Sequence, residues 1–251
     1  MSNLWKMYST TAEKYCKHVG PENFNYSLNI SFKYKYMYVE TPKVACSSIK
    51  STLQRMELED PGLYSHDFED LHNRNFSPLI KAQQVGDLDA FMKREDIFRF
   101  CFVRNPYTRL LSSYLDKIQG NRPQKVQVLR QLGFGQDSID MPVSFDEFVA
   151  AVIEQPIYFM DHHWRHQYYQ TFQGAVVYDF VGRFERLDHE LPEVLGRITS
   201  DYEKYLTTEE RHSQNTVNLI SEYYTRKTRR QVYAKFEQDF SFFGYSEKLP
   251  G

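Results

Sequence analysis

The alternation of apolar and polar positions predicts a strand, a tight turn and a helix near the start of the chain. Residues 34–40 (YKYMYVE) alternate as a β-strand does, and Pro42 ends the pattern because proline lacks the N–H that ladder pairing requires. Ser47 or Ser48 can then cap a helix that runs to about Glu57.

A second strand and helix follow the same plan. The apolar run 97–103 (IFRFCFV) leads to Asn105, which can cap a helix, and to Pro106, which suits the first helical position. Apolar residues then recur at helical spacing and form one continuous stripe: Tyr107, Leu110, Leu111, Tyr114, Leu115 and Ile118.

A third strand is predicted over residues 176–184 (VVYDFVGRF), with a helix over 188–198 and a mostly helical, basic end over about 221–240. Strands that alternate with helices predict an α/β fold, with a parallel sheet covered by helices on both faces. Ligands bind such sheets at the carboxyl ends of the strands, where the turns 41–50 and 104–113 are expected to lie.

The composition is that of a soluble globular protein. The 251 residues are 41% hydrophobic and 25% charged, which fits a single domain over residues 1–251. The net charge of -2 gives no general attraction to nucleic acid, so no nucleic-acid partner is expected. Three separated cysteines (Cys16, Cys46 and Cys101) argue against a disulfide framework, and no apolar run has the length of a signal peptide or membrane span. We therefore expect a cytoplasmic protein, whose oligomeric state these features do not indicate.

The first turn (TPKVACSSIK, 41–50) combines a lysine with two hydroxyls at a helix start. Free N–H groups and the positive end of the helix dipole favour a phosphate or sulfate there. The residues of this candidate site are Lys43, Val44, Ala45, Cys46, Ser47 and Ser48. An ordinary helix start with serine caps is the alternative. The turn is not a Walker A loop, because it has no glycine and its lysine precedes Ser47 by four residues.

Cys46 has a second possible role as a nucleophile, because a helix N-terminus can lower a thiol pKa. No base is placed beside Cys46 by the sequence, and a tight loop needs a small side chain in any case. The structural role is therefore favoured.

The second turn (FVRNPYTRLLSSY, 102–114) places Arg104 at a strand end and Ser112 eight residues later. At about 100° per residue, Ser112 and Arg109 both fall off the apolar stripe, so we expect them to be free to meet a ligand. An arginine fork and a serine hydroxyl suit a phosphate group. The alternative is that Arg104 pairs with a carboxylate and Ser112 is merely solvated.

These two turns resemble the 5′-phosphosulfate loop and the 3′-phosphate segment of sulfotransferases that use 3′-phosphoadenosine 5′-phosphosulfate (PAPS). MDHHW (160–164), YDFVGRFE (178–185) and the ending VYAKFEQDFSFFGYS (232–246) are similar to signatures of the carbohydrate sulfotransferases related to the HNK-1 and chondroitin/dermatan 4-O enzymes.

This resemblance covers about residues 34–246 and implies a P-loop-like, three-layer α/β fold with a central parallel sheet flanked by helices. It implies that Lys43, Ser47 and Ser48 hold the 5′-phosphosulfate and that Arg104 and Ser112 hold the 3′-phosphate. It also implies PAPS as the donor and a carbohydrate or other hydroxyl group as the acceptor.

The sequence departs from the animal Golgi members of that family. It begins at the domain rather than at a membrane anchor, and residues 171–177 (TFQGAVV) lack their Cys-x-x-Cys-like pair. Both features fit a cytoplasmic, microbial-type enzyme; the Golgi lumen is expected only if the chain is an excised domain. An animal glycosaminoglycan acceptor is therefore not implied.

A hydroxyl acceptor needs a general base, and histidine is the usual choice near neutral pH. His66 and His72 lie between the two turns, where related sulfotransferases place a catalytic His or Glu. His66 is the first candidate and His72 the second, with Lys43 as the catalytic cation. Neighbouring carboxylates, Asp67, Glu69 and Asp70, can orient an imidazole or act as the base, and the alternative is that both histidines are surface residues.

Further basic and histidine positions carry weaker predictions. Arg183 follows the glycine of YDFVGRFE, where relatives usually carry lysine, and is expected to face the cofactor. The run Arg226, Lys227, Arg229 and Arg230 is more typical of a solvated helix face than of an anion site.

His162 and His163 are candidates for acceptor or cofactor contact or for structural packing. With His166 they also suggest zinc, but no second cluster supplies ligands at a recognised spacing, so no metal is expected.

Two other functions remain possible. A nucleotide kinase or NTPase also binds phosphates at strand-to-helix turns, but it requires a glycine-rich loop and a magnesium-binding carboxylate. A non-catalytic module that binds PAPS or its desulfated product PAP would keep both turns and lack a base.

Overall fold

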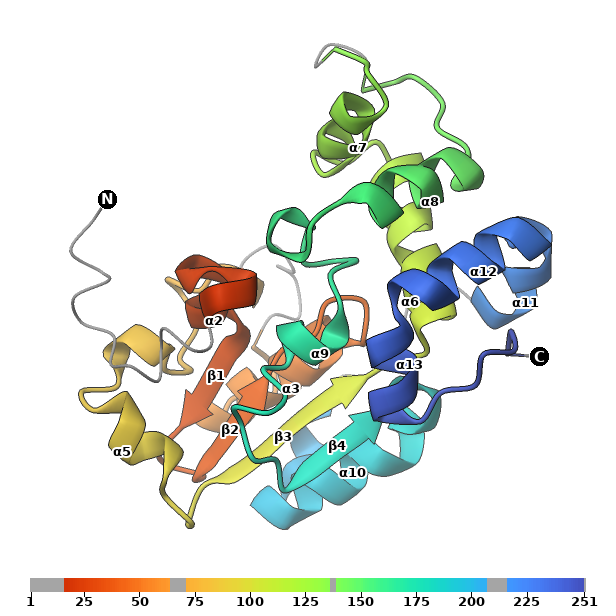
Figure 1. Cartoon of the computed structure of the whole chain (residues 1–251). Helices are drawn as coiled ribbons and strands as arrows, with labels where there is room; N and C mark the ends of the chain where they lie inside the picture. The colour runs from red at the N-terminus through yellow and green to blue at the C-terminus, as the bar shows by residue number, and fades with distance from the viewer. Residues whose placement is uncertain (1–15, 64–70, 136–138, 207–215, 251) are drawn as a thin grey trace. The chain divides into compact units, whose positions relative to one another are not determined.

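The computed structural model describes residues 16–63, 71–135, 139–206 and 216–250. They form two compact units (Figure 1), one from Met1–Val103 with Tyr169–Arg211 and the other from Arg104–Tyr168 with His212–Gly251. We call them unit 1 and unit 2 and describe each by itself. This division does not test the single-domain prediction, which stays a prediction.

Unit 1 contains a four-stranded sheet in the order β1-β2-β3-β4. Its strands are β1 (Leu28–Ser31), β2 (Tyr36–Val39), β3 (Phe98–Val103) and β4 (Phe180–Arg183). The pairs β2–β3 and β3–β4 are parallel, and β1 pairs antiparallel with β2. The predicted α/β class and parallel sheet are confirmed, with β1 as an antiparallel edge strand that the sequence analysis missed.

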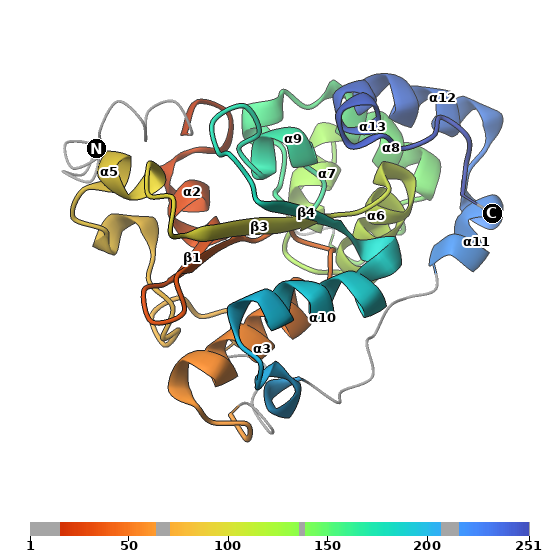
Figure 2. The ribbon, with the colours of Figure 1, turned by 90° about the horizontal axis from the view of Figure 1, so that it is seen from below.

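Helices cover both faces of this sheet because its strands alternate buried side chains between two clusters. Tyr36 and Tyr38 pack with α3 (Cys46–Leu58) and α10 (Leu187–Ile198). Met37 and Val39 point the other way, into a cluster that includes residues of α2 (Pro21–Ser27) and α5 (Leu88–Met92). Figure 2 shows α3 and α10 together on one side of the strands.

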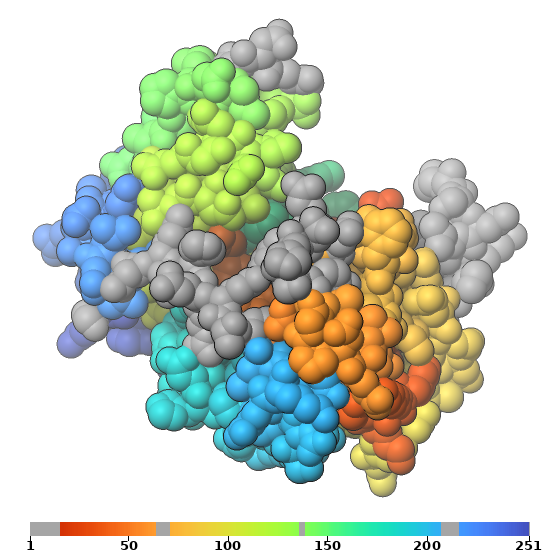
Figure 3. Space-filling model, turned by 180° about the vertical axis from the view of Figure 1, so that it is seen from behind, coloured from red at the N-terminus to blue at the C-terminus, as the bar shows by residue number. Residues whose placement is uncertain are grey.

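Short 3-10 turns complete unit 1. They are η2 (Ala82–Gln84), η6 (Phe184–Arg186) and η7 (Tyr202–Tyr205). In Figure 3, α3 (orange) lies beside the light-blue segment that contains η7 on the face shown.

Close packing between β3 and β4 explains why the fifth residue of YDFVGRFE is glycine. Gly182 pairs with Phe102 across β4 and β3, and a Cβ atom at Gly182 would lie 2.3 Å from a ring carbon of Phe102. Only glycine therefore allows β4 to approach β3 this closely while Phe102 keeps its position.

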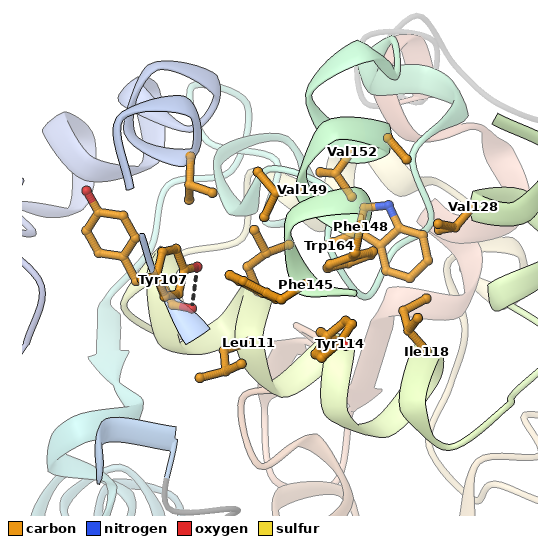
Figure 4. Close-up of a cluster of buried hydrophobic side chains, with 14 of the residues drawn as sticks. Tyr107, Leu111, Tyr114, Ile118, Val128, Phe145, Phe148, Val149, Val152 and Trp164 are labelled. Carbon is orange, nitrogen blue, oxygen red and sulfur yellow. Dashed lines mark hydrogen bonds between the residues drawn. The ribbon is translucent and has the colours of Figure 1, made fainter. Parts of the chain in front are cut away.

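Unit 2 is helical around one apolar core (Figure 4). Its elements are α6 (Pro106–Ser113), the π-helical turn η3 (Tyr114–Gln119), α7 (Lys125–Gln131), α8 (Phe145–Glu154), η5 (Ile157–Phe159), α11 (Thr216–Tyr223), α12 (Arg226–Lys235) and α13 (Glu237–Phe243). A further short helix, α9 (Gln167–Gln170), crosses the boundary between the units.

Among the described residues, no helix combines the length and apolar character needed to span a bilayer.

The start of α6 confirms the sequence prediction. The Asn105 side chain accepts a hydrogen bond from the Tyr107 N–H, and Pro106 occupies the first helical position. The predicted stripe lines the core through Tyr107, Leu111, Tyr114 and Ile118 (Figure 4). The last turn is π-helical rather than α-helical, which periodicity alone does not reveal.

Candidate functional site

The turn between β2 and α3 is held in an unusual backbone conformation. Lys43 (φ 67°) and Ala45 (φ 52°) both adopt positive φ values, which disfavour residues with a Cβ by about 1–2 kcal/mol each. Left-handed residues within a turn aim backbone N–H groups into a shared concavity that binds anions. Two left-handed residues so close together make this turn, which has no glycine, a candidate for such a cradle.

The first turn of α3 adds to this cradle. Its N-cap is Ala45, and no side chain of the described residues caps it. The first N–H groups and the positive end of the dipole of α3 lie directly after this turn. The prediction that Ser47 or Ser48 caps the helix is wrong, because both lie inside α3. Their hydroxyls therefore belong to the helix surface near the cradle rather than to the cap.

His72 lies against this helix and connects it to a buried ion pair. Its Nε2 lies 2.9 Å from the Ser47 hydroxyl, and its Nδ1 lies 2.8 Å from the Lys50 ammonium. Lys50 in turn lies 3.0 Å from a Glu40 carboxylate oxygen, with both side chains almost fully buried. The sequence analysis named His72 but missed Lys50 and Glu40, although a charged residue at the end of an apolar strand was a usable signal.

Cys46 does not have the properties of a nucleophile. Burial, together with the nearby Glu40 carboxylate, raises the pKa of the Cys46 thiol, and this outweighs the lowering effects of Lys50 and Lys43. A thiol with a raised pKa is mostly protonated at neutral pH and reacts slowly. This direction of shift disfavours a nucleophilic role for Cys46, and its packing role stays a prediction.

In unit 2, Arg104 is buried and firmly placed. Its guanidinium donates hydrogen bonds to the hydroxyls of Thr108 (3.2 Å) and Thr216 (2.5 Å). The Gln167 side chain makes two hydrogen bonds with the backbone of Arg104. The Arg104 N–H donates to Gln167 Oε1, and Gln167 Nε2 donates to the Arg104 carbonyl, both at 2.8 Å. Side chain and backbone are thus fixed separately.

Gln167 is itself held by a carboxylate. Asp239, which is fully buried in α13, accepts hydrogen bonds from the backbone N–H groups of Gln167 (2.7 Å) and Tyr168 (2.9 Å). Burial raises the pKa of Asp239 to about 6, although these two bonds act in the opposite direction. Neither residue was singled out from the sequence; the position of Asp239 inside the family-like ending was the available signal.

The expectation that Arg109 and Ser112 lie off the buried face of α6 is wrong, whereas the structure does not test a phosphate contact by Ser112. Arg109 is 3% exposed and Ser112 is 5% exposed, so neither lies on an open face. Arg109 donates to the backbone carbonyls of Arg165 (2.7 Å) and His162 (2.9 Å), and burial lowers its pKa to about 10. The segment that covers it lies some fifty residues later in the chain, so helical periodicity cannot reveal it.

The MDHHW segment forms a local cluster in unit 2. His163 Nδ1 lies 2.6 Å from an Asp161 oxygen, and one possible ligand atom each from Asp161, His162 and His163 fall within 4.8 Å of one another. Burial alone would raise the pKa of Asp161. The hydrogen bond and the charge of His163 outweigh this effect, and the pKa falls to about 2. His166 does not join this cluster; it is buried against Phe236, where burial, Lys235 and Arg109 lower its pKa to about 3.

The remaining predicted positions fall in three places. His66 lies outside the described residues, as do Asp67, Glu69 and Asp70. Arg183 ends β4, directly opposite Val103 of β3, and its N–H donates to Glu190. In α12, Arg226, Lys227 and Arg230 are exposed and Arg229 is half-buried, which agrees with a solvated helix face.

Comparisons with known proteins point in one direction. Residues 26–246 match the model of a family described as "Sulfotransferase family". Carbohydrate sulfotransferase 14 of Mus musculus is 30% identical over 172 residues, which cover 66% of this chain and 45% of that protein. Carbohydrate sulfotransferase 9 of Homo sapiens is 26% identical over 286 residues (97% of this chain, 62% of that protein), and carbohydrate sulfotransferase 11 of Rattus norvegicus is 28% identical over 244 residues (85% and 65%).

The chain thus spans about half to two thirds of the length of these relatives. No solved structure gave a significant match.

Proposed function

The chain belongs to the sulfotransferase family, whose model matches residues 26–246, and from this premise we propose that it transfers a sulfuryl group from PAPS to a carbohydrate hydroxyl. The carbohydrate acceptor is supported by the relatives, which are carbohydrate sulfotransferases. The donor is supported by the chemistry of the two turns.

The turn before α3 is the observation that carries the proposal. Its left-handed residues Lys43 and Ala45 and the uncapped start of α3 suit the 5′-phosphosulfate of the donor. In the proposed complex, the backbone N–H groups of residues 44–46 contact the anion, Lys43 adds a full positive charge, and Ser47 and Ser48 add hydroxyl donors.

Arg104 and Ser112 are the proposed ligands of the 3′-phosphate. Arg104 supports this role because its guanidinium is preoriented by two threonine hydroxyls and its peptide by Gln167. A guanidinium held in advance loses less conformational entropy when it binds a phosphate. Arg183, at the carboxyl end of β4, is proposed as a further cofactor contact.

The proposed reaction is an in-line transfer. The acceptor oxygen forms a bond to sulfur while the bond from sulfur to the 5′-phosphate oxygen breaks, and the acceptor proton passes to a general base. Lys43 and the start of α3 stabilise the negative charge that develops on the leaving phosphate. His66 remains the proposed base from its position in the sequence.

The experiment is a transfer assay with radiolabelled PAPS against carbohydrates, phenols, lipids and peptides. We expect label on a carbohydrate hydroxyl, no transfer by Lys43→Ala, and a raised KM for PAPS in Arg104→Ala. Lys43→Ala is a clean change because alanine keeps the Cβ, and hence the backbone preference, of the native residue.

Label on phenols, lipids or peptides alone would contradict the carbohydrate acceptor. PAP binding without any transfer would indicate the non-catalytic module, and unchanged kinetics in both variants would overturn the assignment of the two turns.

A further inference from the structure

His72 occupies a position between the proposed phosphosulfate cradle and the buried Glu40–Lys50 pair. The imidazole contacts Ser47, in the first turn of α3, through Nε2 and Lys50, one helical turn further on, through Nδ1. The Tyr26 hydroxyl also lies near Nδ1, at 3.5 Å. The ring therefore connects the Lys50 ammonium to the Ser47 hydroxyl near the start of the same helix.

The chemistry of Lys50 determines which ring nitrogen carries the proton. An ammonium has three donors and no acceptor, so Nδ1 must accept the hydrogen bond from Lys50. In a neutral imidazole the proton then sits on Nε2. A Glu40 carboxylate oxygen lies 3.0 Å from the Lys50 nitrogen, so the ammonium contacts both the carboxylate and the ring.

The orientation of Ser47 follows from that of His72. With Nε2 protonated, the ring donates to the Ser47 oxygen, 2.9 Å away. The hydroxyl hydrogen of Ser47 is then not used toward the ring. Ser47 also forms a hydrogen bond with the Cys46 side chain, and thiol sulfur is a weak acceptor. The hydrogen can therefore turn to an anion at the start of α3, where an acceptor-only phosphate or sulfate oxygen needs a donor.

We propose that His72 is a positioning residue: it fixes the Ser47 hydroxyl as a hydrogen-bond donor toward the 5′-phosphosulfate end of the donor. This inference rests on the proposed function. It differs from the role of general base predicted for His72, because a base must offer a ring nitrogen that accepts the proton of the acceptor hydroxyl. Here Nδ1 accepts from Lys50, and Nε2 carries a proton.

Two substitutions at this position separate the functions of the two ring nitrogens. The amide nitrogen of His72→Gln reaches the place of Nε2 and retains a donor to Ser47. His72→Asn places its carboxamide near Nδ1, where it accepts from Lys50 but does not reach Ser47. His189→Gln, at an exposed position in α10, is the matched control.

The experiment measures the Kd for PAP by calorimetry, and KM for PAPS and kcat, in the wild type, these variants, Ser47→Ala and Ser47→Ala/His72→Asn. We expect His72→Asn to weaken PAP binding and raise KM about tenfold, as for the loss of one charge-assisted hydrogen bond. His72→Gln and His189→Gln should stay within about threefold of the wild type. In the Ser47→Ala background, His72→Asn should have no further effect.

A fall in kcat of about 10²- to 10⁴-fold at unchanged PAP affinity would instead identify His72 as a base and overturn the inference. Normal PAP affinity in folded His72→Asn would also overturn it while leaving the proposed function intact. A wild-type chain that binds no PAP would overturn the proposed function, and the inference with it.

A measurement on the wild type avoids any folding defect of the variants. The ¹⁵N chemical shifts of the His72 ring should show the tautomer with its proton on Nε2. A ring protonated on Nδ1 alone would contradict the proposal.

Discussion

Single residues in this chain hold conformations that their chemistry does not favour. Lys43 and Ala45 have positive φ values, which glycine adopts more readily than residues with a Cβ. The absence of glycine excluded a Walker A loop from the sequence, correctly, but it did not exclude a cradle of backbone N–H groups. Backbone strain of this kind is visible only in the structure.

Gly182 shows the opposite case, a residue whose identity is required by a neighbour. We expect Gly182→Ala to lower the free energy of unfolding by about 1–3 kcal/mol, because its Cβ would overlap the Phe102 ring between β3 and β4. Chemical denaturation measures this change. Gly86→Ala is the control, since nothing lies within 4 Å of a Cβ at Gly86; equal losses in the two variants would contradict the packing argument.

Residues whose function depends on adjacent positions were predictable, and those that depend on distant ones were not. Asn105 as a cap and Pro106 at the first helical position follow from local chemistry. The burial of Arg109 depends on carbonyls at residues 162 and 165, and the role of Gln167 depends on Asp239. No local pattern contains these long-range pairs.

At the scale of elements, α13 stabilises the position of Arg104 through α9. Asp239 holds the start of α9 by two N–H bonds, and Gln167 of α9 brackets the Arg104 peptide. The family-like ending of the chain therefore has a physical role. Through Gln167, it fixes the backbone of Arg104, a proposed phosphate ligand.

We expect Asp239→Asn to destabilise the protein by about 1–3 kcal/mol and to weaken PAP binding. The asparagine amide offers one acceptor oxygen to two N–H donors, so one buried donor loses its partner. Thermal melts and PAP titrations measure both effects, with Glu237→Gln, exposed on the same helix, as the control. If the two variants behave alike, Asp239 does not position Arg104.

The order of strands and helices was predictable from apolar patterns, but their ends were less so. Strands β2, β3 and β4 and helices α3, α6 and α10 all lie within the predicted segments or close to them. The four-residue strand β1 was missed because so short a segment carries too little alternation to identify it. The π-helical turn after α6 was missed because its buried residues, Tyr114 and Ile118, continue the apolar spacing of an α-helix.

For the whole molecule, buried ionisable groups make stability depend on pH. The folded-state pKa of His166, about 3, lies below the ordinary value of 6.5, so the unfolded chain binds a proton there that the folded chain excludes. This contribution is fully present above pH 6.5 and is lost as the pH falls toward 3. The raised pKa of Asp239 acts in the opposite sense below about pH 6, so the two effects partly cancel.

We therefore expect His166→Phe to become more stable relative to the wild type as the pH falls from 6.5 toward 3. The difference should grow by about 1.4 kcal/mol per pH unit within this window. Phenylalanine is similar in size and can keep the contact with Phe236. Denaturation curves at several pH values measure the difference, and a difference that does not change with pH would show that His166 titrates normally.

The family of the whole chain was predictable because four short motifs and the ending occur in the family's order, and the match over residues 26–246 confirms it. This match does not identify the sulfuryl donor, the general base or the acceptor. Lys43, Ser47, Ser48, Arg104 and Ser112 stay predictions as cofactor ligands, and His66 stays a prediction as the base.

The central claim is that this chain binds a 3′-phosphorylated adenine nucleotide, and thermal melting in the presence of PAP tests it most directly. At 100 times its Kd, PAP should stabilise the protein by about 2.7 kcal/mol, which is roughly 5–10 °C for a protein of this size. ATP or GTP with magnesium should give much smaller shifts, as should adenosine 5′-phosphate, which lacks the 3′-phosphate. Equal stabilisation by ATP with magnesium would contradict the sulfotransferase account.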